Sequence, residues 1–372
     1  MQSKKSFLRI VVKTGSSLIS PRGSLIDLKY ISSIIEQLNG LINEGIEVVL
    51  VSSGAIACGM SILKLKKRPQ EISGLQAAAS IGQSELMGIY RRLLKKHNRL
   101  CAQLLLTWED FENRKRYLNV RHTLANLLKN KVLPVINEND TVATDEIRFG
   151  DNDKLSALVA VLLGADLLVI LSDVEGLYRL PQMQVIPVVE KITPEINRLC
   201  CNTEKLGKPS QDKQGCVGGM SSKLEAIKIA TGSGISSIIA SGKSPDALLK
   251  AARGEPVGTF FPAQGASLKA RERWIAYGGR ARGTIIVDQG AKNALIKNGK
   301  SLLSVGIISV RGNFKQNETV SIADPAGSEF ARGKVNFSAC ELQPHIGMPV
   351  RAGEAGRRLE EEVIHRDNLV IL

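Results

Sequence analysis

The stretch Val135-Ile136-Asn137-Glu138-Asn139-Asp140 decides how this chain folds, and Asp151-Asn152-Asp153-Lys154 follows it, starting eleven residues after Asp140. An apolar run that leads directly into amides and carboxylates, with a second polar cluster opening a helix, is typical of a ligand-binding strand end. Open α/β sheets bind ligands outside the carboxyl ends of their strands. The stretch therefore predicts a pocket for a small zwitterion and a metal-bound phosphate.

Outward from this stretch, the first 260 residues alternate between short apolar runs and helical patterns. The apolar runs are rich in Val, Ile and Leu and are bounded by turn residues, which predicts buried strands. They are Leu8 to Lys13, Glu47 to Ser52, Ala102 to Leu106, Val132 to Asn137, Leu167 to Leu171 and Ser237 to Ala240. With helices such as Leu28 to Asn43 between them, these runs predict a layered α/β/α sandwich with a mainly parallel central sheet.

The pattern changes after Trp274 into short β runs separated by turns, such as Thr284 to Val287 and Thr319 to Ile322. A length of 372 residues also favours two domains over one. We therefore predict a first domain over residues 1–262, a linker over 263–276, and a small β-rich domain with a C-terminal tail over 277–372.

The composition is that of a soluble globular protein, with 43% hydrophobic and 23% charged residues. Arg9 and Lys13 interrupt the apolar run at the N-terminus, which argues against a signal peptide, and no segment reaches the roughly 18 apolar residues of a membrane span. The six cysteines show no CxxC spacing, so neither a zinc site nor a disulfide framework is predicted. We expect a cytoplasmic protein without membrane association.

The net charge of +14 comes from 50 basic and 36 acidic residues and raises the question of nucleic-acid binding. A duplex-binding protein gathers its basic residues into one stripe. Here the excess is spread along the chain, and the basic runs Lys64 to Arg68 and Arg91 to Lys96 fit solvated helix faces and loops better. A diffuse positive field would attract anions such as ATP and a dicarboxylate.

Two strand ends near the N-terminus carry residues suited to bind phosphate. The first ends in Lys13-Thr14-Gly15-Ser16, where the lysine offers a point charge and the small residues leave backbone N–H groups accessible to an anion. The second ends in Ser52-Ser53-Gly54, at the expected N-terminus of a helix whose dipole favours an anion. Ser53 taken alone fits an N-cap residue equally well.

Two later segments have a similar character. Ser172-Asp173 follows an apolar run, and a Gly-rich segment leads into hydroxyl groups and Lys223 at the start of a helix. The Gly-rich segment fits a phosphate cradle or, as the alternative, a flexible surface loop with an N-cap serine. The candidate residues of these segments are Ser172, Asp173, Gly218, Gly219, Met220, Ser221, Ser222 and Lys223.

The order and the residues of these motifs resemble those of the amino acid kinase superfamily, and within it those of the glutamate 5-kinase family. The matching segments are Val11 to Ser16, Ser53 to Ile56, Pro134 to Asp140, Gly150 to Asp153, Ser172 to Asp173 and Gly218 to Lys223. The segment from about Arg282 to Val335 looks like the PUA domain that many bacterial members carry. The resemblance implies an amino acid kinase domain over 1–262 and a PUA-like domain over 277–372.

The resemblance further implies ATP-dependent phosphorylation of the γ-carboxylate of L-glutamate to L-glutamyl 5-phosphate, the first step toward proline. A glutamate side chain titrates near about 4.3 and is already ionised at neutral pH, so no general base is required. None of the four histidines lies at a predicted strand end. The reaction instead needs positive charge around the transferred phosphoryl group, which two lysines and the cofactor Mg²⁺ would supply.

Carried over residue by residue, the resemblance assigns three roles. Lys13 and Lys223 would flank the transferred phosphoryl group, and Asp153 would orient them. The residues that would bind glutamate are Ser53, Asp140 and Asn152, supported by Asn137 and Asp151. The residues that would line the nucleotide site are Lys13, Ser172, Asp173 and Gly218 to Lys223.

The sequence leaves two other kinds of function open. The same fold could phosphorylate acetylglutamate, aspartate, carbamate or UMP, although the run Asn137 to Asp140 and the PUA-like segment favour free glutamate. A protein of another class would bind or modify RNA through the PUA-like domain, but an aromatic content of 4% disfavours base stacking as the main activity. The resemblance also implies a homo-oligomer and feedback inhibition by proline.

Overall fold

The computed structural model describes residues 7–21, 25–142, 152–179, 182–199, 219–264, 269–278, 281–346 and 362–372. It divides into two compact units, one of residues 1–110 and 114–267 and one of residues 111–113 and 268–372. The domain limits expected from the sequence, at residues 262 and 277, remain a prediction.

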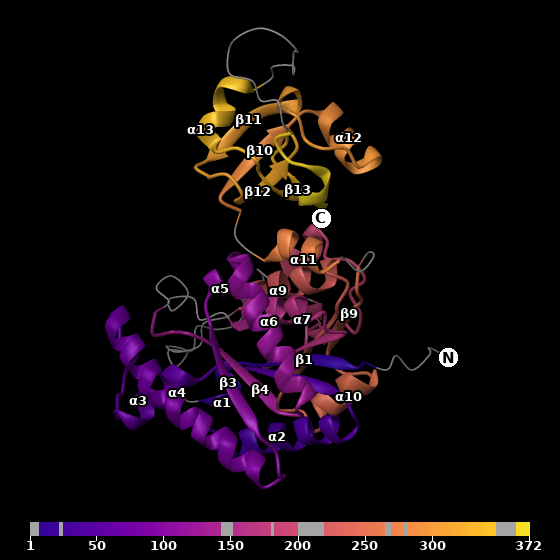
Figure 1. The fold of residues 1–372 in the computed structure, drawn as a ribbon. Helices are drawn as coiled ribbons and strands as arrows, with labels where there is room; N and C mark the ends of the chain where they lie inside the picture. The colour runs from indigo at the N-terminus through magenta and orange to yellow at the C-terminus, as the bar shows by residue number, and fades with distance from the viewer. Residues whose placement is uncertain are drawn as a thin grey trace. The chain divides into compact units, whose positions relative to one another are not determined.

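The larger unit is built on a seven-stranded sheet with the strand order β3-β4-β2-β1-β5-β8-β9 in the described part of the chain (Figure 1). Neighbouring strands run parallel, except that β9 is antiparallel to β8. The strands are β1 (Arg9–Thr14), β2 (Glu47–Ser52), β3 (Cys101–Leu106), β4 (Leu133–Glu138), β5 (Leu167–Ser172), β8 (Ser236–Ser241) and β9 (Thr259–Phe261). Each of the six predicted strands is present within one residue of its predicted bounds.

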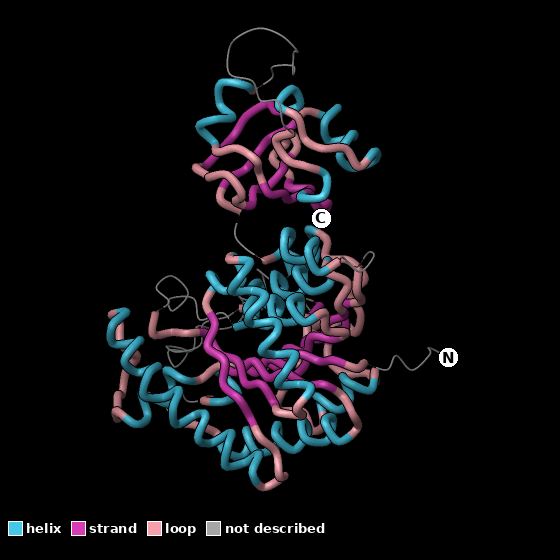
Figure 2. The backbone as a smooth tube through the Cα atoms, viewed as in Figure 1, coloured by secondary structure: helices cyan, strands magenta, loops and turns pink. Residues whose placement is uncertain are grey.

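Helices cover both faces of this sheet (Figure 2). Helices α2, α4 and α10 pack on one face, and α6, α7 and α9 pack on the other. The helices of the unit are α1 (Ser16–Ile19), α2 (Leu28–Asn43), α3 (Ala55–Ile62), α4 (Ile72–Lys95), α6 (Arg114–Lys129), α7 (Asn152–Leu163), α9 (Met220–Gly232) and α10 (Ala247–Arg253). The short helix α5 (Trp108–Glu112) has residues in both units. This arrangement confirms the predicted α/β/α sandwich. A short hairpin of β6 (Tyr178–Arg179) and β7 (Gln184–Val185) lies outside the main sheet.

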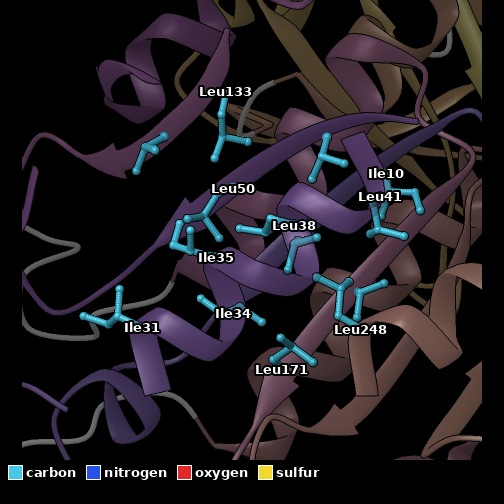
Figure 3. Close-up of a cluster of buried hydrophobic side chains, with 14 of the residues drawn as sticks. Ile10, Ile31, Ile34, Ile35, Leu38, Leu41, Leu50, Leu133, Leu171 and Leu248 are labelled. Atoms are coloured by element: carbon cyan, nitrogen blue, oxygen red, sulfur yellow. The ribbon is translucent and has the colours of Figure 1, made fainter. Parts of the chain in front are cut away.

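The core beneath the sheet forms because α2 has one apolar face (Figure 3). Its buried apolar positions recur at helical spacing, and they pack against apolar side chains of the strands. The buried residues of α2 in this core are Ile31, Ile34, Ile35, Leu38 and Leu41. Asp27 starts the helix as its N-cap, where a carboxylate oxygen accepts from the backbone N–H of Tyr30 at 2.9 Å.

The strand order changes direction beside β1, which has β2 on one side and β5 on the other. In an open α/β sheet, the crevice at such a switch point is where ligands bind, outside the carboxyl ends of the strands. Lys13 near the end of β1 and Ser172 at the end of β5 lie at the carboxyl edge of these two neighbouring strands. The fold therefore places a candidate site at the strand ends that the sequence indicated.

The smaller unit contains a mixed five-stranded sheet in the order β11-β10-β12-β13-β14. Its elements are α11 (Ala270–Tyr277), β10 (Gly283–Val287), α12 (Gln289–Asn298), β11 (Ile307–Gly312), β12 (Thr319–Ala323), β13 (Glu329–Lys334), α13 (Ala339–Leu342) and β14 (Leu369–Ile371). Alternate residues of the strands, such as Ile285, Val287, Val320 and Ile322, are buried in its own hydrophobic core. The predicted β-rich C-terminal domain is thus confirmed. No helix within the described ranges is both long and apolar enough to cross a membrane.

Candidate active site

The side chains of Lys13 and Lys223 meet at the carboxylate of Asp153. Lys13 Nζ lies 2.5 Å from Asp153 Oδ1, and Lys223 Nζ lies 3.2 Å from Asp153 Oδ2. No more than 8% of any of these three side chains is exposed. Two buried ammonium groups therefore share one carboxylate, which leaves one positive charge in excess.

The charge state of Asp153 follows from two opposed effects. Burial favours the neutral acid, because a buried carboxylate loses its hydration. The charges and hydrogen bonds of Lys13 and Lys223 outweigh burial and lower the pKa of Asp153 to about 2. The hydroxyl of Ser222 also donates to Asp153 Oδ2 at 3.0 Å. Asp153 is therefore ionised at neutral pH and holds both lysines.

Three segments far apart in the sequence supply this cluster. Lys13 lies near the end of β1, Asp153 lies in the first turn of α7, and Lys223 lies in the first turn of α9. Beyond β1, the backbone N–H of Gly15 donates to Leu171 O of β5 at 3.3 Å, which ties the end of β1 to its neighbour. The structure thus brings together the two lysines and the carboxylate that the family resemblance had grouped in one site.

A second cluster of polar side chains lies at the ends of β2 and β4. Asn152 Nδ2 lies 2.9 Å from each of three acceptors, which are Ser52 O, Ser53 Oγ and Asn137 Oδ1. Asn137 Nδ2 in turn donates to Gln83 Oε1 of α4 at 2.8 Å. Because Asn152 precedes Asp153 directly, this cluster adjoins the lysine pair.

Backbone groups determine the orientation of both asparagine amides. The backbone N–H of Glu138 donates to Asn137 Oδ1 at 2.9 Å, and Ser52 O can only accept. The remaining amide atom, Asn152 Oδ1, is buried and makes no hydrogen bond within the described residues. A buried acceptor without a donor is unfavourable, and an N–H group of a bound ligand would satisfy it.

Ser53 is not the N-cap of α3, so that alternative is wrong. The N-cap residue is Gly54, whose φ of 104° lies in the left-handed region that glycine adopts readily. A Cβ atom at this position would also lie 2.8 Å from Ile19 Cγ2. Since Gly54 makes the turn into the helix, the hydroxyl of Ser53 is left to accept from Asn152.

Asp140 follows β4 and lines a cavity of about 430 Å³ beside α4 and the ends of β3 and β4. Gln83, Arg91 and Glu138 also line this cavity. Burial raises the pKa of Asp140 to about 6, against the opposing effect of the charge of Arg68. A cationic ligand group placed here would lower this pKa again and favour the carboxylate.

The other candidates for the nucleotide site lie at the carboxyl end of β5 and at the start of α9. Ser172 is buried and donates through its hydroxyl to Asp173 Oδ1 at 3.2 Å, whereas Asp173 is exposed. Gly219 is the N-cap of α9, and Met220 to Lys223 form its first turn. Among all the predicted site residues, Asp151 of the glutamate site and Gly218 of the nucleotide site lie outside the described residues.

Two residues of α4 that support the site, Gln83 and Tyr90, are missing from the sequence-based selection. Ser52 Oγ donates to Ser53 O at 3.0 Å, so the hydroxyl of Tyr90, 2.7 Å away, is the donor to Ser52 Oγ. Gln83 lies on the buried face of α4. Gln83 is an amide among the apolar positions of that face, but this pattern alone does not indicate which strand residue it contacts.

Together, the two clusters can bind a phosphate-bearing anion next to a ligand with N–H donors. Ammonium groups act strongly on phosphate oxygens where little water competes. Among the residues that the structure describes, no three His, Cys, Asp or Glu side chains are grouped so as to hold a metal ion. Mg²⁺ fits such a site through phosphate oxygens and water, which are its usual ligands beside substrate phosphates.

Comparisons with known proteins agree with this geometry. The model of the amino acid kinase family matches residues 8–241, and the PUA domain model matches residues 283–350. A glutamate 5-kinase of Caldanaerobacter subterraneus subsp. tengcongensis is 43% identical over 98% of this chain and 98% of its own. One of Nitrosospira multiformis is 46% identical over 99% of each chain. The resemblance seen in the sequence is thereby confirmed, and the chain belongs to the amino acid kinase family, within its glutamate 5-kinase branch, and carries a PUA domain.

Proposed function

We propose that this protein is an ATP-dependent kinase that phosphorylates the γ-carboxylate of L-glutamate. The product is L-glutamyl 5-phosphate, the first intermediate of proline biosynthesis. The observation that carries the proposal is the pair of buried lysines on Asp153, directly beside an amide cluster in which Asn152 Oδ1 finds no donor among the described residues. The alternatives of acetylglutamate kinase, aspartate kinase and RNA-binding protein are not favoured, since relatives of nearly full length are named glutamate 5-kinase.

The acceptor needs no proton removal, because its side chain titrates near about 4.3. One oxygen of the γ-carboxylate attacks the γ-phosphorus while the bond from that phosphorus to the bridging oxygen breaks and ADP leaves. Both reactants are anions, so their repulsion is the main obstacle to in-line approach. Lys13 and Lys223 lower this obstacle by placing two positive charges beside the transferred phosphoryl group in a buried environment.

Asp153 acts in this scheme as a positioning residue. Without it, the two ammonium groups would repel each other across a poorly hydrated space. Its two oxygens each hold one lysine, so that both charges are in place before the nucleotide binds. Preorganised charge is effective in catalysis because little reorganisation is needed when the reaction occurs.

The amide cluster and the cavity next to it form the glutamate subsite. Asn152 Oδ1 and the carboxylate of Asp140 are acceptors that suit the α-ammonium group, which carries three N–H donors. Ser53 and Asn137 hold Asn152 in this orientation. Asp151, which lies outside the described residues, is assigned a supporting role on the family resemblance alone.

The nucleotide subsite extends from Lys13 toward the end of β5 and the start of α9. Its residues are Lys13, Ser172, Asp173 and Gly218 to Lys223. The N-terminus of α9 favours the phosphates through the positive end of its helix dipole. Mg²⁺, when bound to ATP, would neutralise part of the phosphate charge and be held chiefly by phosphate oxygens and water.

An assay with glutamate, aspartate and N-acetylglutamate side by side tests the function. Purified protein is supplied with ATP and Mg²⁺, and any acyl phosphate is trapped with hydroxylamine as the hydroxamate. We expect ADP and hydroxamate in equal amounts with glutamate, and at least about 100-fold less with the other two acceptors. Turnover that prefers aspartate or N-acetylglutamate would overturn the assignment.

Feedback inhibition by proline and assembly into a homo-oligomer belong to the same proposal. Both come from the family resemblance. Inhibition by millimolar proline in the same assay and the mass in solution test them separately. RNA binding by the PUA domain is the less favoured role, and filter binding to tRNA at physiological salt tests it.

A further inference from the structure

Three side-chain amides form a continuous chain from α4 through β4 to α7. Gln83 Oε1 accepts from Asn137 Nδ2 at 2.8 Å, and Asn137 Oδ1 accepts from Asn152 Nδ2 at 2.9 Å. The exposed fractions of Gln83, Asn137 and Asn152 are 9%, 3% and 6%. Because these amides are buried, water does not readily replace a bond lost from the chain.

The chain has a direction, since every amide has a donor end and an acceptor end. Ser52 O requires the nitrogen of Asn152, and the backbone N–H of Glu138 requires the oxygen of Asn137. A flipped Asn137 would set three donors against one another. The nitrogen of Asn137 must therefore face Gln83, and an acceptor is needed there.

We infer that Gln83 is a positioning residue for glutamate binding, which acts through Asn137 to direct Asn152 Oδ1 at the α-ammonium group of the substrate. The inference rests on the proposed function, because it takes an amino acid as the ligand of Asn152. Gln83 does not bond to Asn152 itself in this arrangement. It supplies the acceptor for the buried Asn137 Nδ2, so that Asn137 is fully hydrogen-bonded in the one orientation that Asn152 requires.

Kinetics of two matched variants test this role. Gln83→Met keeps the length of the side chain and removes the acceptor. Gln37→Met is the matched control, because Gln37 is a buried glutamine of α2 that accepts from the backbone N–H of Leu248 and lies outside the chain of amides and the cavity. We expect Gln83→Met to raise the KM for glutamate about tenfold and to leave the KM for ATP within about twofold. Gln37→Met should change neither KM by more than about twofold. A glutamate KM in Gln83→Met that stays within twofold of wild type would overturn the inference.

A double-mutant cycle shows whether the effect passes through Asn137. In an Asn137→Ala background, the residue through which Gln83 acts is missing. Adding Gln83→Met should then change the glutamate KM by less than about twofold. Effects that multiply as if the two residues were independent would contradict the relay.

A third variant keeps the test decisive if Gln83→Met does not fold. Gln83→Glu retains an oxygen that accepts from Asn137, so its glutamate KM should stay within about threefold of wild type. A tenfold rise in this variant would contradict the inference. Wild-type protein is assayed alongside: no glutamate-dependent turnover there refutes the proposed function, whereas normal wild-type turnover with an unaffected Gln83→Met refutes only the role of Gln83.

Discussion

Asp153 Oδ1 lies 2.5 Å from Lys13 Nζ, although the two residues belong to a strand and a helix that are distant in the sequence. A carboxylate that is 0% exposed would by itself bind a proton. It stays ionised because Lys13 and Lys223 both contact it. These three side chains are therefore charged and organised before any ligand arrives, and together they carry one net positive charge.

Removing either lysine should abolish most of the turnover. We expect Lys13→Ala and Lys223→Ala each to lower kcat by about a thousandfold or more, because each removes a charge next to the transferred phosphoryl group. Lys228→Ala, at an exposed position of the same helix as Lys223, is the control and should retain activity. Circular dichroism verifies folding. Turnover near the wild-type value in either site variant would exclude that lysine from the reaction.

Acid unfolding reports on the ion pairs of Asp153. Its pKa falls from 3.8 to about 2 on folding, so the folded state binds fewer protons between these values. The stabilisation is fully present above about pH 4 and is lost as the pH falls through about 2, amounting to about 2 kcal/mol. In urea unfolding, Asp153→Asn should lose less stability than wild type over this range.

At neutral pH the same variant should be less stable than wild type by about 3 kcal/mol, since two buried ammonium groups lose their partner. Exposed Asp173 provides the control, and Asp173→Asn should leave the acid-induced loss of stability nearly unchanged. Identical pH dependence of wild type and Asp153→Asn would show that these ion pairs do not contribute.

Glutamate binding should weaken in mild acid because of Asp140. Its pKa of about 6 means that the carboxylate becomes neutral as the pH falls below that value, and a neutral acid attracts an ammonium group less. We expect the KM for glutamate to rise between about pH 7.5 and about pH 5.5. Asp140→Asn should have a high glutamate KM throughout that range, with little pH dependence. Equal effects of the substitution on the KM for ATP would remove Asp140 from the amino-acid subsite.

The close packing of α3 on α4 depends on Gly82. A Cβ atom at this position would lie 1.9 Å from Ala55 O, so Gly82→Ala should force the helices apart and lower stability by about 2 kcal/mol or more. Gly88 in the same helix is the matched control, because its nearest neighbour would be Arg92 Nη1 at 3.4 Å. Gly88→Ala should be neutral or gain up to about 1 kcal/mol from helix propensity. Thermal unfolding distinguishes the two, and equal melting temperatures would contradict this account.

Much of the fold follows from local pattern. Buried parallel strands are continuous apolar runs, and segments such as Glu47 to Ser52 and Leu167 to Leu171 have the length and the β-branched content of such strands. The polar residues after these runs necessarily lie at the carboxyl edge of the sheet. This is why Lys13, Ser53, Asn137 and Asp140 could be predicted as site residues from the sequence alone.

The supporting residues could not be found in this way. Gln83 and Tyr90 occupy positions in a long amphipathic helix whose pattern is fully explained by packing. Only their contacts with Asn137 and Ser52 give them a role in the site. Such contacts depend on which helix covers which strand, and local periodicity carries no information about that.

By itself, the sequence determined the layered sheet, the polar strand ends and the family, because each of these depends on residues that are close together along the chain. The family resemblance implied that Asp153 orients Lys13 and Lys223. Only the tertiary structure shows that each oxygen of Asp153 contacts one lysine and that Asn152 Oδ1 has no hydrogen-bond partner among the described residues. The physical reason is that both features depend on the order of the strands and on the burial that results. Residues of remote segments come into contact and lose their hydration only when the sheet has assembled.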